Sequence, residues 1–246
     1  MYTYRLTLCY DGSRYNGWQR QGNTPNTIQE KIETLLSRLL EEEIEVAGSG
    51  RTDAGVHAAG QVVSFHTAKH PDPTILLKEI RRYLPEDIGA LALSEASPRF
   101  HARLNATGKT YTYRVWNSDE PNVFGRKYMY SFPDALDLEA MELAAGDLLG
   151  THDFMSFCAN KRMKKSTVRT VSAITIRQQG HELLFTFTGD GFLYHMVRIL
   201  VGTLLEVGAG QRDPRSMPAL LDARDRSQAG ALAPAHGLRL EQVFYD

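Results

Sequence analysis

The sequence predicts an α+β protein made of two tandem halves, each with the order strand, helix, strand, strand, helix, strand. Three observations predict it: alternating apolar and polar stretches typical of half-buried strands, stretches with apolar residues at helical spacing, and the recurrence of one element order. The 246 residues, 42% of them hydrophobic, are enough to bury one large core or two smaller ones. We expect the halves to be residues 1–105 and 106–246.

The first half opens with an alternating stretch at residues 2–10, which predicts a strand ending at Asp11 and Gly12. Thr27 and Glu30 form a capping box, a signature of a helix start. The helix that follows carries one apolar face, made of Ile28, Ile32, Leu35, Leu36 and Leu39. Further strands are predicted at 44–48, 61–67 and 88–96, and a second helix after Pro73 and Thr74.

The second half repeats this order of elements although its residues differ. Strands are predicted at 109–117, 168–179, 181–189 and 238–246, and helices at 137–150 and 192–208. A further stretch, 126–132, is expected to pair with the first of these strands. Gly180 marks a turn between two strands, and Gly150 is expected to end the first helix.

The formal net charge is −1, so the charge of the whole chain does not point to nucleic-acid binding. Residues 161–170 are locally basic and contain no acid: the cations are Lys161, Arg162, Lys164, Lys165 and Arg169. A solvated surface is the ordinary interpretation of such a run. Contact with phosphates is the alternative, because phosphate contacts act within about a Debye length.

No stretch approaches the roughly 18 unbroken apolar residues of a membrane span. The N-terminus has no basic region before an apolar core, so no signal peptide is expected. Cys9 and Cys158 lie far apart in apolar or aromatic surroundings. We therefore expect reduced thiols and a cytoplasmic location, without a membrane partner.

The most informative stretch is AGSGRTDAGVHAAG, residues 47–60, which is rich in glycine and carries Asp53. A phosphate cradle, a metal or hydrolase site, a carboxylate presented to a substrate and an ordinary turn are the alternatives. Gly50 to Gly55 match the first six places of a phosphate-binding loop. Val56 and His57 then stand where that mechanism needs Lys and Ser or Thr, which argues against nucleotide hydrolysis.

Metal and hydrolase sites are also poorly supported. His66 and His70 are four residues apart, but Pro71 follows and the segment leaves a strand, so they would not share a helical face. Ser49 lies outside a nucleophile-elbow motif. A sugar hydrolase usually needs two carboxylates flanking the bond, and only Asp53 stands out.

Three residues outside ordinary patterning remain. An Asp in a glycine-rich turn commonly caps its own backbone, and presenting Asp53 to a substrate is the alternative. Arg198 lies on the nearly all-apolar helix 192–208 and needs a carboxylate or equivalent acceptors if buried. Tyr111 shares a strand face with Tyr113, where core packing and stacking on an unpaired RNA base are both consistent with the pattern.

The sequence resembles the TruA family of bacterial tRNA pseudouridine synthases, in blocks that cover nearly the whole chain in order. These are YDGSRYNGWQRQ (10–21), GSGRTDAGVHAAGQVVSF (48–65), RFHARLNATGKTYTYRV (99–115), GTHDFMSF (150–157), STVRTV (166–171), GFLYHMVRILVGTLLEVGAG (191–210) and GLRLEQVFY (237–245). The resemblance implies a pseudouridine synthase fold, in which two split βαβ, ferredoxin-like halves share a mixed, mainly antiparallel sheet with a central cleft.

The resemblance also implies an isomerase that converts uridines 38, 39 and 40 of the tRNA anticodon arm to pseudouridine. It implies a homodimer bridged by one tRNA, and no cofactor or metal. Asp53 matches the catalytic aspartate, Tyr111 the tyrosine that stacks on the base, and Arg198 the ion-pair partner of the aspartate. Arg51 matches a residue that helps to flip the base. The other expected substrate-binding residues are Gly50, Gly55, His57, Lys161, Arg162, Lys164 and Lys165.

The expected reaction breaks the C1′–N1 bond of uridine, rotates the uracil and joins C1′ to C5. Ionised Asp53 would attack C1′ of the ribose or C6 of the ring, or remove the 2′ proton on a glycal route, and these alternatives stay open. Modification of other RNA uridines, or a non-catalytic RNA-binding module, are the alternative functions.

Overall fold

The computed structural model describes residues 1–160 and 162–246. The chain divides into two compact units, Met1–Thr107 together with Arg239–Asp246, and Gly108–Leu238. Each unit combines helices with a mixed, mainly antiparallel sheet, which confirms the predicted α+β class. The last strand is grouped with the first unit, whereas the order of elements placed it in the second half.

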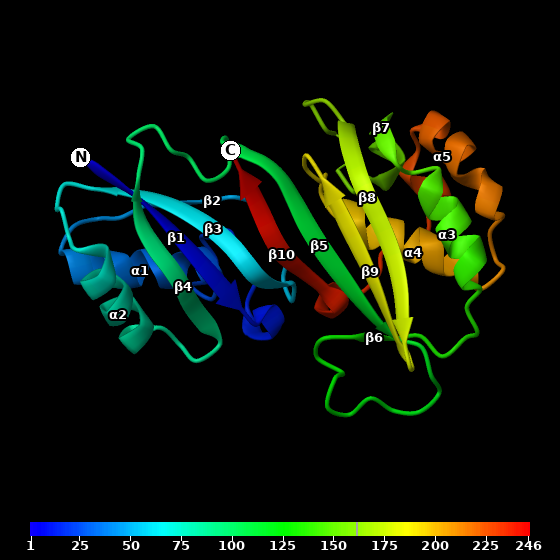
Figure 1. Ribbon diagram of the computed structural model, residues 1–246, viewed down its shortest axis with the longest axis horizontal. Coiled ribbons are helices and arrows are strands. Elements are labelled where there is room, and N and C mark those ends of the chain that lie inside the picture. Colours follow the sequence, from blue (N-terminus) through cyan, green and yellow to red (C-terminus); the bar gives the residue numbers. More distant parts are fainter. Residues whose placement is uncertain (161) are drawn as a thin grey trace. The chain divides into compact units, whose positions relative to one another are not determined.

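The first unit is a sheet of five strands with two helices (Figure 1). Its elements are β1 (Tyr2–Tyr10), η1 (Gly12–Arg14), α1 (Ile28–Leu40), β2 (Val46–Gly48), β3 (His57–Thr67), α2 (Pro73–Tyr83), β4 (Ile88–Ala96) and β10 (Leu238–Tyr245). The strand order is β4-β1-β3, with β2 antiparallel to the C-terminal half of β3 and β10 parallel to its first residues. One neighbour of β3 on that side, β2, directly precedes it in the chain, whereas the other, β10, is the last strand of the chain.

Local sequence explains most of these elements. In β1 the side chains of Tyr4, Leu6 and Leu8 are fully buried, and they alternate with partly exposed neighbours as a half-buried strand requires. Thr27 caps α1 by accepting a hydrogen bond from Glu30 N at 3.3 Å, as the capping box predicts. Asp72 caps α2, where Pro73 is the first helical residue.

One strand of this unit is longer than the sequence indicates. β3 begins at His57, four residues before the predicted strand 61–67. The added residues pair with both β1 and β10, including Ala58 with Tyr10 and with Leu240. A glycine-rich stretch was thus drawn into the sheet by partners that a local pattern does not contain.

The strands of the second unit run in the order β5-β9-β8-β7, with β6 beside β5 (Figure 1). Its strands and α-helices are β5 (Ala106–Trp116), β6 (Tyr130–Ser131), α3 (Leu138–Gly146), β7 (Gly150–Asp153), β8 (Val168–Gln179), β9 (Glu182–Gly189), α4 (Met196–Gly208) and α5 (Met217–Ala223). Short 3-10 helices are η2 (Met155–Phe157), η3 (Pro214–Ser216), η4 (Arg226–Gln228) and η5 (Ala235–Gly237). The core lies between the sheet and α4, with Phe185, Phe187 and Leu200 fully buried.

Two helices of this unit are shorter than predicted. α4 begins at Met196 and not at 192, because His195 adopts a left-handed conformation with φ 63° that interrupts a helix. α3 ends at Gly146, and Gly150, expected as its last residue, opens β7 with φ 100°. α5 and β7 were not predicted. The predicted pairing of 126–132 with the first strand is confirmed, since Tyr130 pairs with Val115.

No helix within residues 1–160 and 162–246 is long and apolar enough to cross a membrane.

Candidate active site

Asp53 lies in the loop 49–56, which joins β2 to β3 in the first unit. Its side chain is partly exposed, and its carbonyl accepts a hydrogen bond from Val56 N at 3.1 Å, which closes a turn. Gly55 occupies this turn with φ 80°, a conformation that glycine adopts without strain. The loop therefore holds a carboxylate at a fixed turn between two strands.

The other predicted residues of this loop have different environments. Arg51 is exposed, whereas Gly50 is buried and its carbonyl accepts a hydrogen bond from Gln61 Nε2 at 3.0 Å. His57 is 4% exposed, and its Nδ1 lies 3.1 Å from Gly12 N and 3.1 Å from Asp11 Oδ1. His57 thus packs inside the unit and holds the preceding segment, so its surroundings favour a structural role.

Residues 11–20, here named the collar segment, pack against the backbone of the Asp53 loop. Trp18 N donates to Thr52 O at 3.0 Å. A Cβ on Gly17 would lie 2.8 Å from the same carbonyl, and one on Gly12 would lie 2.0 Å from Val56 O. Only glycine permits such close backbone approach. We did not predict this role from the sequence, although the spaced glycines and tryptophan of YDGSRYNGW are a usable signal.

Tyr111 lies on β5 in the second unit. It is 8% exposed, and its ring meets Phe192 edge to face, with centroids 5.3 Å apart. Tyr113 on the same strand is fully buried, and its hydroxyl donates to Pro234 O at 2.8 Å. Burial raises the pKa of Tyr113 well above its usual range. The two tyrosines therefore differ: Tyr113 belongs to the core and Tyr111 to its border.

Arg198 lies in the first turn of α4, in the second unit, and is partly exposed. Its Nε donates to Ala233 O at 2.7 Å, and Ala233 N donates to Arg198 O at 3.2 Å. The backbone carbonyl of Ala233 thus fixes the Nε side of the guanidinium. This carbonyl is one of the hydrogen-bond acceptors that we expected Arg198 to need.

The basic segment is exposed where the structure describes it. Arg162, Lys164 and Lys165 all have exposed side chains, while the predicted site residue Lys161 lies outside the described residues. Exposure suits both a solvated surface and a phosphate contact, so this segment stays a prediction.

The residues considered for other chemistries have separate partners. His66 Nδ1 lies 2.9 Å from Thr3 Oγ1, and His70 Nε2 lies 3.1 Å from Glu95 Oε2. Ser49 Oγ donates to Gln61 Oε1 at 2.6 Å. Cys9 is partly exposed and Cys158 is buried, and the two are not joined in a disulfide.

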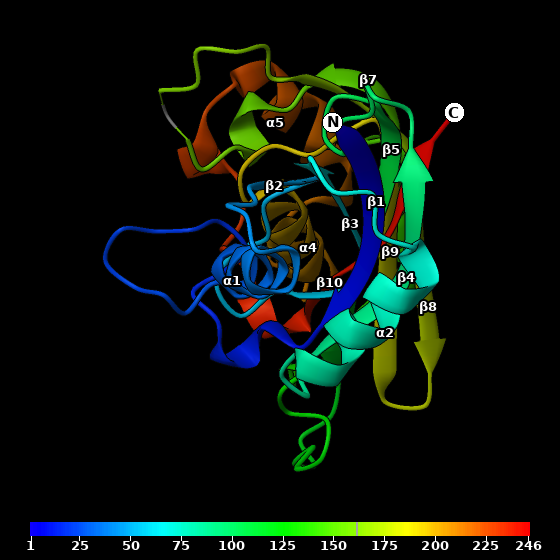
Figure 2. The same cartoon turned by 90° about the vertical axis from the view of Figure 1, so that its left-hand side faces the viewer.

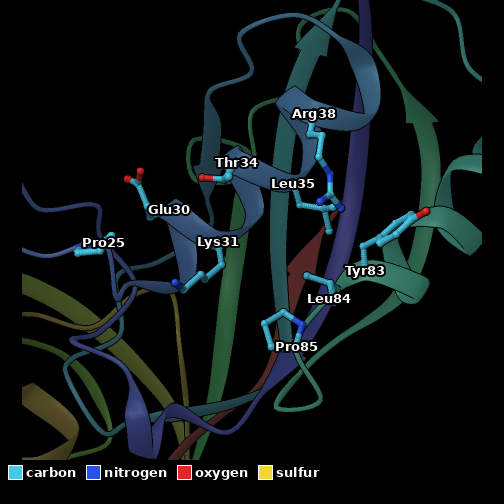
Figure 3. A pocket seen from close by; sticks show the side chains of 9 residues that line it. All are labelled: Pro25, Glu30, Lys31, Thr34, Leu35, Arg38, Tyr83, Leu84 and Pro85. Carbon is cyan, nitrogen blue, oxygen red and sulfur yellow. The ribbon is translucent and has the colours of Figure 1, made fainter.

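A pocket of about 370 Å³ lies between α1 and α2 (Figure 3). Arg38 lies over the ring of Tyr83 there, 4.7 Å from its centroid, in a cation–π contact. The lining comes from α1, from residues 83–85 and from Pro25. The pocket is therefore separate from the loop that carries Asp53.

Comparison with known proteins gives one consistent result. Residues 8–104 and 144–246 match the model of a family described as tRNA pseudouridine synthase. A Bacillus cereus (strain ZK / E33L) protein named tRNA pseudouridine synthase A 2 is 44% identical over 245 residues, covering 100% of both chains. A Moorella thermoacetica protein named tRNA pseudouridine synthase A is 46% identical over 242 residues, covering 98% of each.

One solved structure is distantly similar. It is a chain of a crystal structure titled as a Cbf5-Nop10-Gar1 complex, at 13% identity and a TM-score of 0.39, and the match covers 96% of this chain and 48% of that one. This chain thus spans about half the length of that protein.

Proposed function

Because this chain belongs to the tRNA pseudouridine synthase family, we propose that it converts uridines 38, 39 and 40 of the tRNA anticodon arm to pseudouridine. The observation that carries the proposal is the identity of 42–46% to proteins named tRNA pseudouridine synthase along essentially the whole chain. The matched range 8–104 contains Asp53, and the range 144–246 contains Arg198. Tyr111 lies between the two ranges.

The proposed reaction is an isomerisation, so its atoms balance without a further reactant. The C1′–N1 bond breaks, C1′ joins C5, the C5 proton is removed and N1 ends protonated. There is no net oxidation, reduction or hydrolysis, which is why we propose that no cofactor takes part. The target base must first leave its stack, at a cost of a few kcal/mol, and exposed Arg51 is the residue we assign to this step.

Asp53 is the proposed nucleophile. Its partly exposed position on a fixed turn suits a group that must meet an extruded nucleotide. In the proposal Arg198 is its ion-pair partner, which would favour the charged carboxylate. The Nε bond of Arg198 to Ala233 O holds its guanidinium in place.

Tyr111 is proposed to stack on the uracil and to carry the C5 proton, directly or through water. Its ring is held edge-on by Phe192, which limits the entropy lost when a base stacks on it. We further propose a homodimer, the cytoplasm as its compartment because tRNA is its substrate, and Arg162, Lys164 and Lys165 as phosphate contacts.

The test is incubation of unmodified tRNA with wild type and Asp53→Asn, mapping pseudouridine at every position. We expect wild type to modify positions 38 to 40, and Asp53→Asn to lose about 10³-fold or more of the rate while binding tRNA normally. Normal turnover by Asp53→Asn would remove Asp53 from the nucleophile role. Modification elsewhere would favour another RNA target, and binding without any product would favour an RNA-binding module.

A further inference from the structure

Glu33 is a buried carboxylate on α1 that the proposed reaction does not use. The residue is 5% exposed, beside the fully buried side chains of Ile32 and Leu36. Burying a carboxylate costs several kcal/mol unless an opposite charge and hydrogen bonds compensate. A core position of this kind would ordinarily hold an apolar side chain. We therefore asked which parts of the protein the carboxylate of Glu33 connects.

Both oxygens of Glu33 are engaged. Oε1 accepts hydrogen bonds from Gln29 Nε2 at 2.8 Å and from Val46 N at 3.1 Å. Oε2 accepts from Arg20 Nη1 at 3.0 Å. The carboxylate thus joins α1 to the first residue of β2 and to the last residue of the collar segment.

Gln29, one turn earlier on α1, makes the same connection a second time. Its Oε1 accepts from Arg20 N at 3.0 Å and from Gln19 Nε2 at 2.7 Å. Its Nε2 also donates to Val46 O at 3.3 Å, and its backbone N donates to Trp18 O at 3.0 Å. Gln29 and Glu33 thus tie α1 to the end of the collar segment by four hydrogen bonds and to Val46 of β2 by two more.

β2 and the collar segment both adjoin the Asp53 loop and support it. β2 ends at Gly48 and the chain continues directly into the loop, while the collar segment holds the loop at Thr52 through Trp18. Figure 2 shows the blue loop that leads into the start of α1. A shift of either support would move the carboxylate of Asp53 relative to a bound nucleotide.

We propose that Glu33 is a positioning residue, which sets the place of Asp53 by holding β2 and the collar segment at a fixed separation. The inference rests on the proposed function, since it assigns Glu33 a part in the same reaction. It acts through Val46 and Arg20 and does not touch the substrate.

The test compares Glu33→Gln with Glu30→Gln in the full chain. Glu30 lies on the same helix, its side chain is 31% exposed, and its Oε2 is 3.9 Å from Nε of the same Arg20. We expect Glu33→Gln to slow single-turnover conversion of enzyme-saturated tRNA by about tenfold or more, because small misplacements of a reacting group are costly. Glu30→Gln should stay within about twofold of wild type, and the Kd for tRNA should change by less than about twofold in both.

A purely structural role would give a different result. It would lower Tm but leave the rate per folded molecule unchanged, so rates are measured well below the Tm of each variant. A normal rate in Glu33→Gln overturns the inference, as does a loss confined to Kd. If Glu33→Gln does not fold, Arg20→Gln decides in the same assay: slower conversion at unchanged Kd supports the inference, and normal conversion overturns it.

The wild-type sample separates this inference from the proposed function. Wild type that forms pseudouridine beside an equally fast Glu33→Gln removes only the role of Glu33. Wild type that forms no pseudouridine in tRNA removes the proposed function and the inference together.

Discussion

The hydroxyl of Tyr15 donates a 2.7 Å hydrogen bond to the carboxylate of Asp87. The other oxygen of Asp87 accepts Nε and Nη2 of Arg14 at 2.9 and 2.6 Å. Burial raises the pKa of Asp87, but the bonds from Tyr15 and Arg14 outweigh burial and leave it below the ordinary value of 3.8. This cluster attaches the collar segment to the turn before β4.

The first prediction concerns the pH dependence of this cluster. Because folding lowers the pKa of Asp87, its contribution to the free energy of unfolding is present above 3.8 and is lost as pH falls through the lower, folded value. We expect Asp87→Asn to lower the free energy of unfolding by about 1–3 kcal/mol at neutral pH, and by progressively less below about pH 4. Urea unfolding across pH, with exposed Glu86→Gln as control, measures this. A difference that does not shrink in acid would contradict it.

The second prediction compares two glycines of the same region. Gly17 has φ 89° and its added Cβ would lie 2.8 Å from Thr52 O, whereas an added Cβ on Gly22 meets nothing within 4 Å. Gly17→Ala should therefore destabilise the protein by about 1–3 kcal/mol and slow conversion, since Thr52 adjoins Asp53. Gly22→Ala should be nearly neutral. Thermal unfolding and single-turnover rates check both, and equal effects of the two variants would refute the role of the collar segment.

The third prediction isolates the hydroxyl of Tyr111. Tyr111→Phe keeps the ring and its contact with Phe192, so packing and base stacking should persist. If the hydroxyl carries the C5 proton, conversion should fall by about 10²-fold at an unchanged Kd for tRNA. Tyr130→Phe, in the same unit, is the matched control. A Tyr111→Phe enzyme with the wild-type rate would leave Tyr111 a stacking role only.

The fourth prediction tests the basic segment. Changing Lys161, Arg162, Lys164 and Lys165 together to Gln should weaken tRNA binding and flatten the slope of log K against log salt, by up to about 0.9 for each phosphate that the variant no longer neutralises. The control exchanges Lys for Arg and Arg for Lys at the same positions, which preserves the charge. Affinity is measured from low to moderate salt. An unchanged slope would make the segment a solvated surface.

Short-range sequence patterns predicted most of the secondary structure. The capping box at Thr27, the alternation of β1 and the turn at Gly180 depend on neighbours within a few residues, and each predicted element was found. The predicted start of α4 was wrong because a hydrophobicity pattern does not reveal the left-handed backbone of His195. The early start of β3 at His57 was missed because the strands that pair with its first residues, β1 and β10, are distant in sequence.

The candidate site shows the same division. The loop around Asp53 stands out because Gly50 and Gly55 flank an ionisable residue in one short stretch. The residues that support this loop could not be predicted from the sequence. The close approach of Gly17 to Thr52 and the hydrogen bonds of Glu33 to Arg20 and Val46 exist only after folding. A hydrophobicity pattern also gives no sign that Glu33, a charged residue, is buried.

The parallel pairing of β10 with β3 affects how the protein folds during its synthesis. A ribosome that has completed residues 1–107 has synthesised the whole first unit except the strand that pairs with His57 and Ala58. Closing so long a stretch of chain is entropically slow, and until it happens this edge of β3 is an open strand edge, prone to wrong pairing. We therefore expect the residues next to the Asp53 loop to complete their strand pairing late during synthesis.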